Sequence, residues 1–144
     1  MIRIKPGARL RLIQSTDATP VPIANGIGGI LNNPDVEQYS TFPASPFDAN
    51  KNFIAPQAGF FRFNTAAEIQ TGGLLLVSIA DARRGQQYDS AVQGAQNLSG
   101  RLDVTLYLEK GDAVQRYISL YDGTDTTVFP RANSNFYEIE YLGL

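Results

Sequence analysis

The stretch that decides the fold is NFIAPQAGFFRF, residues 52–63. It gathers four phenylalanines, a proline and a glycine within twelve residues. Pro56 and Gly59 are turn-forming residue types, so they mark a turn or the start of a strand. Side chains alternate across a strand, which places Phe61 and Phe63 together on one face. The stretch therefore predicts an aromatic-rich strand of a β-sandwich.

Apolar and polar residues alternate with the period of a β-strand along much of the remaining chain. Alternating runs occupy residues 9–12, 101–108, 113–121 and 135–144, and residues 72–80 are apolar on both faces. Turn residues separate these runs, and residues 14–52 are irregular enough to predict long loops with short strands. No segment carries a helical apolar stripe. The pattern predicts one all-β domain, a two-sheet antiparallel sandwich or jelly roll.

Composition excludes several kinds of chemistry. The chain has no cysteine and no histidine, so it lacks thiolate chemistry and the commonest general base near neutral pH. A net charge of −2 and a single basic doublet, Arg83-Arg84, give no reason to expect nucleic acid as a partner. Charged residues make up 18% of the chain, below the usual ~25%. A surface rich in Asn, Gln, Ser and Thr suits a protein that buries part of that surface in an assembly.

The N-terminal sequence and the apolar runs bear on localisation. Residues 1–12 alternate basic and apolar side chains without the continuous apolar region of a secretory signal. No apolar run approaches the roughly 20 residues needed to span a bilayer. We therefore expect a protein made in the cytoplasm without a signal peptide and not inserted in a membrane.

Three short motifs occur in order along the chain. The first is Phe47-Asp48 followed by Phe53, Pro56, Gly59, Phe61 and Phe63; the second is Leu108, Gly111, Asp112 and Val114; the third is Ser134 and Phe136. Together they resemble the signature of the C1q and tumour necrosis factor-like jelly-roll family. The chain departs from that pattern at Glu138, where the family often has glycine. The resemblance covers residues 8–144, so residues 1–7 are predicted to form an N-terminal arm.

The resemblance implies a ten-stranded jelly roll that assembles as a homotrimer and recognises a partner. By that analogy Phe61, Tyr137 and Tyr141 are candidates for the trimer interface, with burial in the core of the single chain as the alternative. Some relatives bind calcium, which makes Asp122 and Asp125 of the YDGTDTT loop candidate ligands. Turn chemistry explains Asp122-Gly123 equally well, and no other cofactor is predicted.

Enzymatic function has little support in the sequence. No Gly-x-Ser-x-Gly motif is present, and no histidine is available to activate a serine. Glu138 and Glu140 stand about 7 Å apart on one strand face, but carboxylates two residues apart are common on solvated strands. We predict that the protein is not an enzyme and has no catalytic residues.

Two binding functions follow from the resemblance. One is a virion structural protein, such as a bacteriophage capsid decoration or fibre head that docks on a capsid or tail. Its arm would hinge at Pro6-Gly7 and dock by strand addition, and the protein would lie at the surface of a virion or extracellular particle. The alternative is an adhesive head that binds a host receptor or cell-surface glycan through Arg83, Tyr88 and Tyr121.

Overall fold

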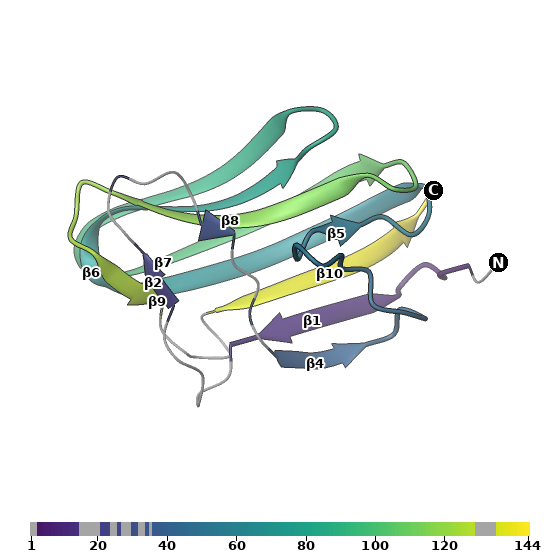
Figure 1. Cartoon of the computed structure of the whole chain (residues 1–144), viewed down its shortest axis with the longest axis horizontal. Coiled ribbons are helices and arrows are strands. Elements are labelled where there is room, and N and C mark those ends of the chain that lie inside the picture. The colour runs from purple at the N-terminus through teal and green to yellow at the C-terminus, as the bar shows by residue number, and fades with distance from the viewer. Residues whose placement is uncertain are drawn as a thin grey trace.

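A computed structural model describes residues 3–14, 21–23, 26, 30–31, 34, 36–128 and 135–144. Ten strands and no helix occur among them (Figure 1). The strands are β1 (Arg9–Ile13), β2 (Val21–Ile23), β3 (Ile30–Leu31), β4 (Val36–Ser40), β5 (Phe53–Ile54), β6 (Gly59–Asp81), β7 (Gln86–Leu108), β8 (Ala113–Tyr121), β9 (Thr126–Val128) and β10 (Phe136–Gly143). The predicted all-β class is confirmed.

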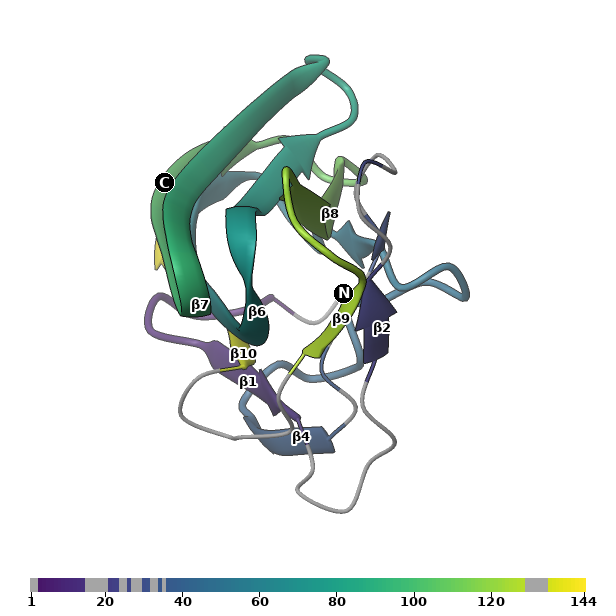
Figure 2. The same cartoon turned by 90° about the vertical axis from the view of Figure 1, so that its left-hand side faces the viewer.

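Two strands of 23 residues, β6 and β7, form one antiparallel hairpin that runs the length of the molecule. Its register is constant from Gly59 opposite Leu108 to Asp81 opposite Gln86. The alternation pattern predicts separate strands at residues 52–63 and 72–80, but Gly72 lies inside β6. A Cβ at Gly72 would stand 2.1 Å from the carbonyl oxygen of Ala95 on β7. Glycine therefore permits a close backbone approach where the hairpin bends (Figure 2).

The bend divides the hairpin between two layers. In the first sheet, the first half of β6 and the second half of β7 continue the order β4–β1–β10–β6–β7. In the second sheet, the other half of β6 lies between the other half of β7 and β8, and β8 also pairs with β3 and β5. All of these pairs are antiparallel, so the predicted two-sheet antiparallel sandwich is confirmed.

Phenylalanine rings from both sheets form the centre of the core. Phe53, on β5 of the second sheet, lies 5.4 Å from Phe61 and 5.4 Å from Phe63, both on β6 of the first sheet. All three are completely buried. Edge-to-face ring pairs of this kind contribute roughly 0.5–1.5 kcal/mol each beyond the area that they bury. The predicted core positions of Phe53 and Phe63 are confirmed.

The predicted alternation also holds in the other strands of the first sheet. Buried positions are Leu10, Leu12, Leu106, Leu108, Tyr137, Ile139 and Tyr141, while Arg9, Arg11, Asp103, Glu138 and Glu140 lie on the opposite face. We call that opposite face, turned away from the second sheet, the outer face.

The remaining signature residues have structural roles. The carboxylate of Asp112 accepts the Glu109 N–H at 2.9 Å, and the backbones of Gly111 and Asp112 both bond to Ala55. These bonds fix the β7–β8 turn against the segment that precedes β6. Pro56 lies in a bend just before that strand. Ser134, the other residue of the third motif, lies outside the described residues.

Gly59 is predicted to be the least replaceable of the signature residues. Its φ of 147° disfavours other residue types, and an added Cβ would stand 2.6 Å from the Tyr141 ring. We expect Gly59→Ala to cost about 2–4 kcal/mol of unfolding free energy, because strain and overpacking add. Gly85→Ala, at φ 63° with open space around it, should cost about 1 kcal/mol. Equal losses in urea denaturation would contradict this account.

Candidate binding surface

The three residues predicted at a trimer interface lie in the core of the single chain. Phe61 and Tyr137 are completely buried and Tyr141 is 3% exposed. The Phe61 and Tyr141 rings lie 4.9 Å apart, and the Tyr141 hydroxyl donates to the carbonyl of Ala58 at 3.1 Å. Since the second sheet already covers this face, these side chains have almost no surface left for another chain. This corrects the interface assignment in favour of the alternative, core packing.

Exposed large hydrophobic residues gather on the outer face instead. Among the described residues they are Val36, Tyr39, Phe60, Leu142 and Leu144. Phe60 of β6 and Leu142 of β10 alternate with buried neighbours along their strands. Val36 and Tyr39 of β4 lie opposite outward-facing residues of β1. Phe60 also contacts Tyr107 of β7 edge-to-face at 5.2 Å. Sequence reasoning missed this set, although Phe60 was on the face opposite Phe61 by alternation.

Three cross-strand ion pairs cover the centre of the outer face. Arg9 bonds Glu140 at 3.1 Å and Arg11 bonds Glu138 at 3.2 Å, both between β1 and β10. Arg62 of β6 makes two hydrogen bonds to the Asp103 carboxylate of β7, at 2.9 and 2.5 Å. The Arg62 guanidinium holds the pKa of Asp103 below its usual value.

The ion pairs also account for the two glutamates considered for catalysis. Glu138 accepts hydrogen bonds from Arg11 and from the Tyr39 hydroxyl, and Glu140 accepts one from Arg9. Neither carboxylate lines any of the three described cavities. Their arrangement is that of charged pairs on a strand surface.

Two arginines cover Phe136 at one end of the outer face. The guanidinium of Arg11 lies 4.5 Å, and that of Arg101 5.6 Å, from the ring centre. Such cation–π contacts are worth ~0.5–1 kcal/mol at exposed sites. They leave Phe136 only 5% exposed, which makes this signature residue a structural one.

Arg116 of β8 forms a buried polar network between the sheets. It is completely buried, and its guanidinium donates to the Thr65 hydroxyl at 2.6 Å, the Ala66 carbonyl at 2.8 Å and the Asn135 side-chain oxygen at 2.9 Å. Burial lowers the pKa of Arg116 to about 10, so it stays charged at neutral pH. Sequence reasoning missed this residue, although it lies between Val114 and Ile118 on the apolar face of its strand.

Tyr137 carries a buried hydroxyl that has no hydrogen-bond partner in the described part of the chain, and burial raises the pKa of this hydroxyl. Since no bond is lost, we expect Tyr137→Phe to leave the unfolding free energy unchanged or to raise it by about 1 kcal/mol. Tyr141→Phe, which removes the bond to Ala58, should instead lower it by about 1 kcal/mol. Urea denaturation of both variants measures the difference. A larger loss for Tyr137→Phe than for Tyr141→Phe would show that the Tyr137 hydroxyl has a partner in solution.

The three residues predicted to bind a receptor or glycan are not brought together. Arg83 bonds the buried Asp112 carboxylate at 3.2 Å. The Tyr88 hydroxyl donates to Gln86 at 2.8 Å, and the Tyr88 ring packs on the core. Tyr88 pairs with Ile79 of β6, whereas Tyr121 pairs with Leu74. Five residues along a strand separate these positions by roughly 17 Å.

Asp122 and Asp125 lie in the loop between β8 and β9. Asp122, at φ 54°, lines a shallow hollow of about 460 Å³ whose walls include Gly72, Gly94 and Gly123. Within the described ranges, no group of three or more His, Cys, Asp or Glu side chains is placed to hold a metal ion. Calcium binding stays a prediction.

The part of the chain that the structure describes contains no helix able to span a membrane.

Comparison with solved structures identifies the fold. The Eiger TNF of S. frugiperda aligns with a TM-score of 0.70 and 10% identity, over 96% of this chain and 94% of that one. Murine APRIL (pH 8.0 structure) aligns at 0.62 and 10% identity, over 94% and 98%, and the globular domain of zebrafish complement 1qA at 0.61 and 12%, over 98% and 100%. No protein-family model and no curated protein matches the sequence. The chain therefore has the C1q and TNF-like jelly-roll fold, which confirms the resemblance found in its sequence motifs.

Proposed function

We propose that this chain is a non-enzymatic binding module that assembles as a homotrimer on the surface of a virion, as a capsid decoration or fibre head. The observation that carries the proposal is the gathering of Val36, Tyr39, Phe60 and Leu142 on the outer face. Exposed apolar groups concentrated on one surface are characteristic of protein interfaces. The likeness of the fold to TNF and C1q domains favours three copies.

The outer face is suited to burial between chains. Three of its arginines, Arg9, Arg11 and Arg62, are already paired with carboxylates of the same chain, so covering these pairs separates no charge from its partner. Arg101, beside Phe136, bonds the Asn64 side chain instead. A ring of three needs a second, different surface on each chain. Among the described strands β7 pairs only with β6, so its other edge faces outward along 23 residues. We propose that the outer face of one chain meets this edge of the next.

Binding, as opposed to catalysis, is supported by the chemistry of the side chains. The sequence offers neither histidine nor cysteine as a base or nucleophile. Glu138 and Glu140 are engaged with arginines. The virion role is favoured over an adhesive head because Arg83 is held by Asp112, and Tyr121 lies far from Tyr88 along the sheet.

Co-sedimentation tests this function directly. The purified protein would be incubated with capsids, with tails and with host cells, and the bound amount measured in each pellet. We expect saturable binding to a particle at a fixed number of copies. Retention on cells or polysaccharide, with no binding to particles, would contradict the virion role and favour the adhesive head.

A further inference from the structure

The segment of residues 3–8 lies against the body of the domain. Ile4 is 6% exposed, and the Gln57 side chain bonds both backbone groups of Ile4, accepting its N–H at 2.9 Å and donating to its carbonyl at 3.1 Å. The Gly7 N–H donates to the Tyr141 carbonyl at 2.7 Å. The described part of the predicted N-terminal arm is therefore held in place and forms part of the surface beside it.

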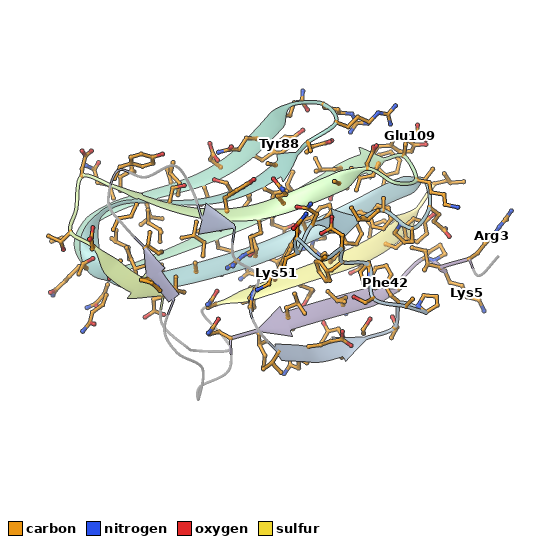
Figure 3. The ribbon with its side chains drawn as sticks, viewed as in Figure 1. Arg3, Lys5, Phe42, Lys51, Tyr88 and Glu109 are labelled. Carbon is orange, nitrogen blue, oxygen red and sulfur yellow. The ribbon has the colours of Figure 1, made fainter. Side chains whose placement is uncertain are left out.

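Two adjoining cavities open beside this segment. One, of about 180 Å³, is lined by Ile4, Phe42, Pro43, Ala44, Ser45, Pro46 and Pro56. The other, of about 320 Å³, is lined by Arg3, Ile4, Lys5, Gly7, Ala8, Thr41 and Pro43. They share Ile4 and Pro43, and we call them together the end groove. Figure 3 shows Arg3, Lys5 and Phe42 near one another at the end of the molecule where the N-terminus lies.

The first cavity is chemically suited to an apolar side chain. Three of its seven lining residues are prolines, which have no N–H to donate, and Phe42 and Ile4 add further apolar surface. Its one side-chain hydroxyl, on Ser45, accepts the Phe47 N–H at 3.5 Å. A sugar needs several hydrogen-bonding groups for its hydroxyls. This cavity offers too few of them.

The second cavity carries positive charge that no carboxylate offsets. Within the described part of the chain, neither Arg3 nor Lys5 forms an ion pair, whereas Arg9, Arg11, Arg62, Arg83 and Arg84 all do. Both side chains line the same cavity. An anionic group placed there would be attracted by two cations and would meet no opposing carboxylate.

We propose that the end groove binds an extended peptide segment in which a large apolar residue is adjacent to acidic residues. The apolar side chain enters the cavity lined by Phe42 and the prolines, and the carboxylates face Arg3 and Lys5. This inference rests on the proposed docking function and names the chemistry of the partner segment. The groove is formed within one chain, so it can be tested apart from trimer assembly.

The first test uses a fluorescein-labelled, blocked peptide, Gly-Leu-Glu-Glu-Gly, and fluorescence anisotropy with the full chain. We expect saturable binding that weakens as salt is raised from 50 to 500 mM. Replacing each glutamate with glutamine should weaken binding roughly two- to fivefold, the range for exposed ion pairs. Replacing the leucine with glycine should abolish it. Equal binding of all three peptides, or binding of sialyllactose without peptide binding, would overturn the proposal.

The second test changes the groove. Lys5→Gln should weaken peptide binding roughly two- to fivefold. Adding Arg3→Gln to that variant should weaken peptide binding by a similar factor again. Ala44→Trp, which fills the apolar cavity, should abolish binding. Gln86→Glu changes the net charge by the same amount as Lys5→Gln, but it lies on β7 outside the groove lining, so binding should not change. An equal loss from Gln86→Glu would overturn the proposal.

Oligomeric mass separates this proposal from the proposed function. The groove variants should keep the wild-type mass in sedimentation, because they leave the outer face intact. If the wild type forms trimers and binds particles but does not bind the peptide, the groove proposal is wrong and the proposed function stands. Peptide binding by a chain that does not bind particles would support the groove and contradict the docking function.

Discussion

Replacing Arg116 with alanine is expected to lower the free energy of unfolding by about 3–5 kcal/mol, the largest stability loss of any single change considered. The guanidinium bonds Thr65 and Ala66 on β6 and Asn135 just before β10, all in the buried space between the sheets. Its removal takes a charged donor away from three buried acceptor oxygens, on Thr65, Ala66 and Asn135, although the Thr65 hydroxyl keeps its bond to the Phe136 carbonyl and the Asn135 amide keeps its bond to Gln14. We therefore expect the loss of unfolding free energy to come mainly from the buried oxygens that no longer accept a hydrogen bond from Arg116.

The measurement is the midpoint and slope of urea unfolding. Arg116→Lys should recover little of the loss, since one ammonium cannot reproduce the guanidinium geometry. Arg101→Ala is the matched control, because Arg101 is exposed and, within the described residues, its side chain bonds Asn64 and lies over the Phe136 ring. It should cost about 1 kcal/mol. If Arg116→Ala cost no more than Arg101→Ala, the buried network would have no role in stability.

If the protein assembles as the proposed trimer, the double substitution Phe60→Glu/Leu142→Glu is expected to give monomers at concentrations where the wild type stays assembled. Both side chains are 43% exposed in the single chain, so the fold tolerates the change. In the assembly the new carboxylates would be buried without partners, which costs several kcal/mol at each contact. Sedimentation velocity gives the mass of each species.

Tyr121→Glu is the control for this change. Tyr121 is a partly exposed aromatic residue at the end of β8, on the second sheet and away from the outer face. It should leave the trimer intact. Circular dichroism would show whether each variant keeps its β-structure. A folded Phe60→Glu/Leu142→Glu variant that remains a trimer would contradict the assignment of the outer face as the interface.

Much of the fold was predictable, because alternation fixes which residues share a strand face. It put Phe61 with Phe63 and Tyr137 with Tyr141, and both pairs are on one side of the first sheet. Alternation does not say which face the second sheet covers. The resemblance placed Phe61, Tyr137 and Tyr141 at the trimer interface, whereas the second sheet buries them. The exposed residues are instead Phe60 and Leu142, which are next to Phe61 and Tyr141 in the sequence and point to the opposite face.

Arg116 and the long hairpin show two further limits of the sequence pattern. The alternation pattern assigns position 116 to the core, but a charged residue such as arginine normally lies at the surface. The burial of Arg116 depends on Thr65 and Asn135, which are distant in sequence. Gly72 and Gly73 look like a break between strands, yet they are a bend within β6. The end groove joins residues 3–8 to residues 41–46 and Pro56, and that contact requires the folded sheets.

The most direct test of the account is the mass of the purified protein in solution, measured by sedimentation velocity over a range of protein concentrations. We expect one species of three chain masses that persists on dilution, because in the proposed trimer the outer face of each chain is covered by its neighbour. A monodisperse monomer at every concentration would contradict it.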